Sequence, residues 1–158
     1  MTYEILIADD HPLFRSALHQ ALSLGLGPDV RLVEVESIAE LETRLGEKAD
    51  WDLVLLDLNM PGAYGFSGLG LLRGQYPQIP VVMVSAQEEA SIVVRSREFG
   101  ASGFIPKSSA LETIQLAVRK VLEGDVWWPP QASETISVSA EAKAASAGLA
   151  SLTPQQFR

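Results

Sequence analysis

Leu53-Val54-Leu55-Leu56-Asp57 is a short apolar run that ends abruptly in an acid. No polar residue interrupts the run before Asp57, which is typical of a strand that is buried on both faces of a sheet. Residues 5–8 and residues 81–84 repeat the pattern, and each of these runs also ends in a polar residue. We therefore expect buried parallel strands whose carboxyl ends carry polar side chains.

Segments with helical periodicity separate the expected strands. The strands are expected at residues 5–8, 32–35, 53–56, 81–84 and 103–105. The first helix is expected to have Pro12 in its first turn and to end at Gly25 and Gly27, and the other helices are expected at residues 38–45, 69–76, 88–99 and 111–122. Residues 32–35 alternate in character and so suit a strand near an edge, and Ser108 or Ser109 is expected to cap the last helix. The alternation predicts an α/β protein with a flavodoxin-like, doubly wound, five-stranded parallel sheet of order 2-1-3-4-5 and helices on both faces.

Composition excludes several classes of protein. The 158 residues are 47% hydrophobic and 20% charged, which fits one globular domain with a short appendage. The 12 basic and 20 acidic residues give a net charge of −8, which argues against direct binding of nucleic acid or an anionic membrane by this segment. There is no cysteine, so disulfides and thiolate chemistry are excluded. We find no signal peptide and no apolar run of membrane-spanning length, and we expect a cytoplasmic protein.

Polar side chains follow the expected strands at the point where each strand ends. In a parallel sheet this edge would gather the carboxylates of Asp9, Asp10 and Asp57 with the Ser85 hydroxyl and the Lys107 ammonium. Three close carboxylates repel one another unless a proton or a cation lies between them, and hard oxygen ligands suit Mg²⁺. The group therefore predicts a site that accepts a phosphoryl group on an aspartate.

Four motifs in this order resemble the receiver domain of bacterial two-component response regulators. They are Asp9-Asp10, Leu-Asp-Leu-Asn-Met-Pro-Gly at residues 56–62, Ser85-Ala86, and Lys107. The local sequences Asp-Asp-His-Pro-Leu-Phe-Arg at 9–15 and Gly-Phe-Ile-Pro-Lys-Ser at 103–108 are similar to the NarL/LuxR-type subfamily. The resemblance covers about residues 3–124.

The resemblance implies a metal site and a phosphoacceptor. Asp57 would be the phosphoacceptor. Asp10, Asp57 and the backbone carbonyl of Asn59 would bind Mg²⁺ directly, and Asp9 would bind it through a water molecule.

The resemblance also implies a switch. Ser85 and Lys107 would bind the phosphoryl group, and Ser85 and Phe104 would change conformation in response. Many relatives have a proline after the lysine in a cis peptide; here Ser108 follows Lys107, and the isomer of that bond stays open.

By the same resemblance, the protein would be a signalling switch rather than an enzyme. A sensor histidine kinase or a small phosphodonor would supply the phosphoryl group, and the response would control transcription. The resemblance allows a homodimer, contact with DNA only through a missing C-terminal domain, and no contact with a membrane.

The chain divides into three expected parts. Residues 1–126 would form the receiver domain, and residues 127–151, which are rich in Ala, Ser and Glu, would form a linker. Residues 152–158 contain Leu-Thr-Pro-Gln-Gln, which resembles the beginning of a LuxR-type helix-turn-helix domain that is truncated here.

Two other functions were weighed. A Mg²⁺-dependent aspartyl-phosphate phosphatase would need a second acid two residues after the nucleophile, where Asn59 stands, and an inserted cap. A phosphate-independent interaction module would usually lack a site residue, and none is lost. His11 next to Asp10 suggests a metal ligand, but with no second histidine nearby we expect a loop residue.

Overall fold

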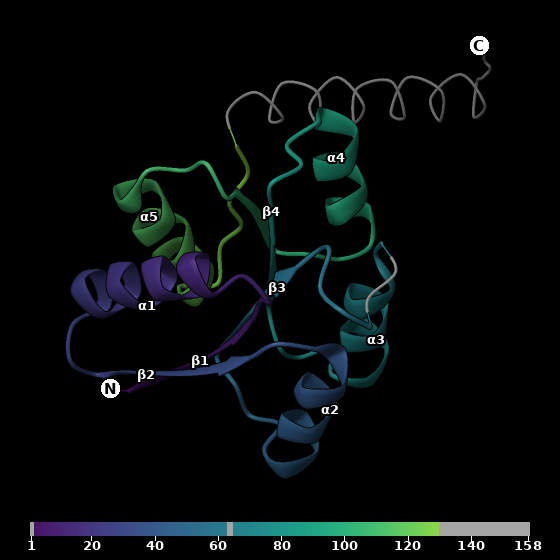
Figure 1. The fold of residues 1–158 in the computed structure, drawn as a ribbon, viewed down its shortest axis with the longest axis horizontal. Helices are drawn as coiled ribbons and strands as arrows, with labels where there is room; N and C mark the ends of the chain where they lie inside the picture. Colours follow the sequence, from purple (N-terminus) through teal and green to yellow (C-terminus); the bar gives the residue numbers. More distant parts are fainter. Residues whose placement is uncertain (1, 63–64, 130–158) are drawn as a thin grey trace, which may run out of the picture.

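A five-stranded parallel sheet lies between two layers of helices in the computed structural model, which describes residues 2–62 and 65–129 (Figure 1). The strand order is β2-β1-β3-β4-β5, so the predicted flavodoxin-like topology is confirmed. The strands are β1 (Tyr3–Ala8), β2 (Val30–Val35), β3 (Leu53–Asp57), β4 (Val81–Ser85) and β5 (Gly103–Pro106). The helices are α1 (Pro12–Leu26), α2 (Ile38–Glu47), α3 (Ser67–Gln75), α4 (Ala90–Glu98) and α5 (Leu111–Leu122).

Successive side chains of a strand point to opposite faces of the sheet, so each apolar run contributes to two hydrophobic cores. Leu53 and Leu55 of β3 join the core under α1 and α5, whereas Val54 and Leu56 face the core under α2, α3 and α4. Figure 1 shows the corresponding arrangement, with α1 and α5 on one side of the sheet and α2, α3 and α4 on the other. Burial of each such side chain contributes roughly 1.5–3 kcal/mol, which explains why β3 and β4 contain no polar residue before their ends.

Two local expectations are corrected. Strand β2 begins at Val30 rather than at residue 32, although its place at the edge of the sheet is as predicted. Helix α5 is preceded by Ala110, which has no side-chain capping bond, so neither Ser108 nor Ser109 caps it. The Ser108 hydroxyl instead donates a hydrogen bond to Glu88 Oε2 at 2.6 Å, because the loop before α4 lies within reach.

Close packing explains Gly68, the second residue of α3. A Cβ atom at Gly68 would lie 3.1 Å from Ile38 Cδ1 and 3.4 Å from Leu56 Cδ2. Gly68 therefore lets α3 approach both α2 and the central strand. The loss in helix propensity, about 1 kcal/mol relative to alanine, is offset by this approach.

The chain after α5 returns to the sheet. Trp127 makes an isolated bridge with Gly103, and its carbonyl accepts a hydrogen bond from the Phe104 N–H at 3.2 Å. Its side chain packs against the α1–α5 core, so residue 127, which is predicted to belong to the linker, still contacts the folded domain. Most of the predicted linker and the predicted start of a second domain at 152–158 lie outside the described residues.

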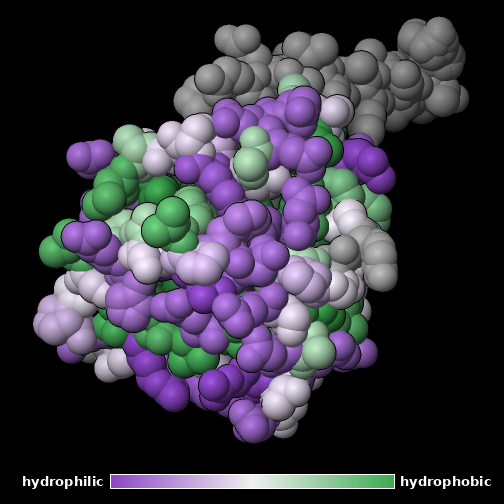
Figure 2. Space-filling model, in the orientation of Figure 1, coloured by the Kyte–Doolittle hydropathy of each residue, from purple (hydrophilic) through white to green (hydrophobic). Residues whose placement is uncertain are grey.

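Hydrophilic residues cover most of the face seen in Figure 2, and hydrophobic residues form separate patches there. Within residues 2–62 and 65–129, none of the helices has the length and apolar character needed to cross a membrane.

Candidate functional site

Sheet register brings the predicted site residues to one edge. Asp57 is the last residue of β3, opposite Val84, and Ser85 is the last residue of β4, opposite Pro106. Asp9 directly follows β1, the other neighbour of β3. Lys107 follows β5, and its backbone N–H donates to the Ser85 carbonyl at 2.8 Å. The predicted convergence of these side chains is thus present in the described structure.

The Lys107 ammonium connects two buried acids. Lys107 Nζ lies 3.0 Å from Asp9 Oδ2 and 3.4 Å from Asp57 Oδ2. The side chains of Asp9 and Asp57 are only 2% and 1% exposed, and that of Lys107 is 13% exposed. Water screens these charges poorly, and the Lys107 ammonium lowers the pKa of Asp57 and so favours its ionised form. The Phe14 ring, whose centroid lies 4.9 Å from Nζ, covers the cation from another side.

Burial raises the pKa of Asp57 above the ordinary carboxyl value, and the negative charge of Asp9 adds to this increase. The Asn59 N–H, which donates to Asp57 Oδ1 at 3.2 Å, and the Lys107 ammonium lower the pKa and so oppose the shift. Asp57 is therefore a poorly hydrated carboxylate at the end of a rigid strand, with one oxygen facing a cation.

Two carboxylate oxygens in this pocket lack a hydrogen bond. Asp9 Oδ2 and Asp10 Oδ1 are buried without a hydrogen-bond partner, although Lys107 Nζ lies 3.0 Å from the first and His11 Nδ1 lies 3.2 Å from the second. One ligand atom from each of Asp9, Asp10, His11 and Asp57 lies within 4.8 Å of all the others. Several hard carboxylate oxygens in one small volume suit a divalent cation such as Mg²⁺, so the residues present fit the metal that the fold implies.

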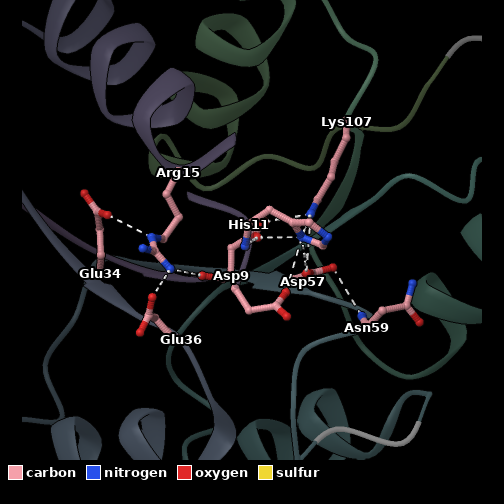
Figure 3. Close-up of polar contacts among 9 residues, drawn as sticks. Asp9, His11, Arg15, Glu34, Glu36, Asp57, Asn59 and Lys107 are labelled. Atoms are coloured by element: carbon pink, nitrogen blue, oxygen red, sulfur yellow. Dashed lines mark hydrogen bonds and ion pairs between the residues drawn. The ribbon is translucent and has the colours of Figure 1, made fainter. Parts of the chain in front are cut away.

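His11 is an exposed loop residue, as expected, but its ring also lies beside this group of acids. Its Nδ1 is 3.1 Å from Asp9 Oδ1, 3.2 Å from Asp10 Oδ1 and 3.4 Å from Asp57 Oδ2. Figure 3 shows the imidazole between the end of the Lys107 side chain and Asp57. The position of His11 directly after Asp10 was the only sequence signal, and it did not indicate where the ring would point.

Arg15 supports the loop that carries the acids. Its Nη1 donates to the Asp9 carbonyl at 2.8 Å and lies 2.9 Å from Glu36 Oε1, and its Nε donates to Glu34 Oε1 at 3.1 Å. Figure 3 shows the guanidinium between the two glutamates and Asp9. Arg15 was not singled out from the sequence, because its partners come from the segment at β2 and its end.

The remaining predicted residues flank the pocket. Ser85 is fully buried, and its Oγ accepts a hydrogen bond from the Gln87 N–H at 3.0 Å. The Asn59 amide donates to Gln87 Oε1 at 3.3 Å, which connects the loops after β3 and β4. Phe104 is fully buried in the core under α2, α3 and α4. Every peptide bond within the described residues is trans, including the one after Lys107.

Comparison with known proteins agrees with this geometry. The family model of the response regulator receiver domain matches residues 5–119. The glycerol metabolism activator of Pseudomonas putida is 44% identical over 133 residues, which cover 84% of this chain and 60% of that protein. The nitrate/nitrite response regulator protein NarL of Escherichia coli K12 is 34% identical over 122 residues, which cover 77% of this chain and 56% of that protein.

A solved structure extends the comparison. A LuxR family DNA-binding response regulator from Silicibacter pomeroyi is 30% identical with a TM-score of 0.71, and the match covers 82% of this chain and 98% of that one. The chain spans little more than half the length of the curated relatives named above. Sequence, fold and pocket together place the chain in the response regulator receiver family, among relatives of the NarL/LuxR type.

Proposed function

We propose that Asp57 accepts a phosphoryl group and that Mg²⁺ is held beside it by Asp10, Asp57 and the backbone carbonyl of Asn59, with Asp9 acting through a water molecule. The observation that carries this proposal is the buried Asp57 carboxylate, 3.4 Å from the Lys107 ammonium, within a group of acids that has unpaired oxygens. The cation would supply charge neutralisation for the incoming phosphoryl oxygens.

The side chains around Asp57 have separate tasks in this proposal. An Asp57 carboxylate oxygen forms the new bond to phosphorus while the bond from phosphorus to the donor breaks, and the electron pair leaves with the donor. The Lys107 ammonium already faces Asp57 Oδ2 and would bind a phosphoryl oxygen. Since the pKa of Asp57 is raised by burial, Lys107 and the Asn59 N–H also keep the nucleophile ionised.

Ser85 and Phe104 form the proposed switch. The Ser85 hydroxyl accepts a bond from the Gln87 N–H and can still donate its own proton to a phosphoryl oxygen. Such a bond would bias the loop after β4 toward a second conformation. Phe104 lies on β5, the strand paired with β4, and its burial means that any rotation would repack the core.

The proposed output is control of transcription through a C-terminal DNA-binding domain. The glycerol metabolism activator and the nitrate/nitrite response regulator named above are longer than this chain. Residues 152–158 resemble the beginning of a LuxR-type helix-turn-helix domain after the 127–151 linker. We propose a sensor histidine kinase or a small phosphodonor as the phosphoryl source, a cytoplasmic location, and a homodimer as the assembled state. In this proposal the receiver is a signalling switch that itself binds neither DNA nor a membrane.

The phosphatase alternative is not favoured. Asn59 stands two residues after Asp57, where that chemistry would need an acid, and it uses its side chain to bind Gln87. An amide cannot donate a proton to a leaving group as a general acid does.

Intact mass spectrometry after incubation with acetyl phosphate and Mg²⁺ tests the proposal. We expect the wild type to gain one phosphoryl group and Asp57→Asn to gain none. Asp29→Asn, which changes an exposed acid outside the pocket, is the matched control and should be labelled like the wild type. Undiminished labelling of Asp57→Asn would refute the assignment.

A further inference from the structure

The imidazole of His11 carries an inference that deepens the proposed function and rests on its metal site. We propose that His11 Nδ1 is a direct ligand of the bound cation, so that the site has a nitrogen donor beside its carboxylates. Such a site would bind first-row transition metals, for example Ni²⁺, more tightly than Mg²⁺.

Distances within the pocket support this role. Two neighbouring ligands of an octahedral ion with bonds of 2.0–2.1 Å lie about 3.0 Å apart. His11 Nδ1 is 3.1, 3.2 and 3.4 Å from one oxygen of Asp9, Asp10 and Asp57 respectively. The nitrogen therefore already lies close to the spacing of a ligand next to three carboxylate oxygens.

The polar contacts of Nδ1 show that it can face a cation in this pocket. Its shortest contact, 2.7 Å, is with the ammonium of Lys107, which has no lone pair and can only donate. Nδ1 then accepts with its single lone pair, which faces the ammonium. The same ammonium lies 3.0 Å from Asp9 Oδ2 and 3.4 Å from Asp57 Oδ2, and a bound metal ion would take its place beside this lone pair and the carboxylate oxygens.

The backbone holds the ring at the pocket. His11 precedes the first residue of α1, Pro12, and its N–H donates to Asp9 Oδ1 at 2.7 Å. The imidazole therefore moves with the loop that carries Asp10, a proposed direct ligand, and Asp9, which is proposed to act through a water molecule. Its side chain makes no capping bond to α1, so replacing it should leave the helix intact.

The chemistry of the donors sets the expected preference. Mg²⁺ favours oxygen ligands, whereas imidazole suits Ni²⁺, Fe²⁺, Cu²⁺ and Zn²⁺. Loss of His11 should therefore affect a transition metal much more than Mg²⁺. Loss of a mere outer-shell partner typically changes metal affinity about 10–100-fold, so we expect His11→Ala to weaken Ni²⁺ binding by at least about tenfold.

Calorimetric titration of the tag-free 158-residue chain with Ni²⁺, and separately with Mg²⁺, tests the proposal. His19→Ala is the matched control, because His19 also lies on the α1 segment but contacts Glu34 at 3.1 Å rather than the pocket. We expect His11→Ala to lose Ni²⁺ affinity and to keep Mg²⁺ affinity, and His19→Ala to keep both. Pulsed electron paramagnetic resonance of bound Mn²⁺ should show imidazole nitrogen in the wild type and in His19→Ala, but not in His11→Ala.

Two results would overturn the role of His11. One is an unchanged Ni²⁺ affinity in His11→Ala with no nitrogen signal in the wild type. The other is tighter binding of both metals by His11→Ala, which would show that the ring occupies the cation's place and is displaced by it. Failure of the proposed metal site is distinguishable, because Asp10→Ala would then bind Mg²⁺ as well as the wild type does.

Discussion

Replacing Asp10 by asparagine should stabilise the metal-free protein. Asp10 contributes one of three carboxylates to the pocket, and the Lys107 ammonium forms ion pairs with the other two, Asp9 and Asp57. Its Oδ1 accepts no hydrogen bond, so the amide forfeits none at that atom. The substitution keeps the shape of the side chain and removes one negative charge.

The magnitude follows from the size of the cluster. Ligand atoms of Asp10 and of the other two acids lie no more than 4.8 Å apart. At that distance two unit charges repel by about 0.9 kcal/mol in water and by about 3.5 kcal/mol at an effective dielectric constant of about 20. The Asp10 side chain is 33% exposed, which favours the lower part of this range. Loss of its favourable position before the N-terminus of α1 costs about 0.3–1 kcal/mol.

We therefore expect a net stabilisation of about 1 kcal/mol, which corresponds to a rise in Tm of about 2–6 °C for a domain of this size. Thermal unfolding in EDTA at low ionic strength measures it, with Asp29→Asn as the control that should not change. Added salt should reduce the difference because it screens the repulsion. With Mg²⁺ the wild type should gain stability by mass action and Asp10→Asn should gain less. A lower Tm for Asp10→Asn without metal would refute the repulsion argument.

Three further predictions concern the pocket and its support. Because the pKa of Asp57 is raised in the folded state, this group stabilises the fold fully below its unfolded pKa of 3.8, and the stabilisation is lost as pH rises through the folded pKa. Urea titrations over this pH range should show that Asp57→Asn removes the loss of stability. Arg15→Met should reduce the free energy of unfolding by about 1–2 kcal/mol and slow phosphoryl labelling, since the Asp9 carbonyl loses its hydrogen bond and two exposed glutamates lose an ion pair; unchanged labelling would contradict a positioning role. Gly103→Ala should destabilise the fold by about 1–3 kcal/mol in urea unfolding, because its Cβ would lie 2.8 Å from the Trp127 carbonyl oxygen; wild-type stability would show that this segment can shift freely.

Much of the fold could be predicted because the information is local. Apolar runs such as residues 53–56 indicate strands buried on both faces, and their alternation with helical segments restricts the sheet to few topologies. The meeting of Asp9, Asp57 and Lys107 follows from that topology, since parallel strands end at one edge. The sequence alone therefore predicts a cation or a phosphoryl group at that edge of the sheet.

Contacts between distant segments were decided only by the tertiary structure. Ser108 is not a helix cap because Glu88, twenty residues earlier, accepts its hydrogen bond. Arg15 meets Glu34 because the parallel register of β1 and β2 sets that residue opposite Ile7, close to the Asp9 loop. The ring of His11 faces the acids because the backbone between β1 and α1 turns it there. The orientation of one side chain cannot be predicted from its position in the sequence. Charge and hydrophobic period along the chain determined which groups reach the pocket, whereas packing between segments determined how they are held and which additional donor joins them.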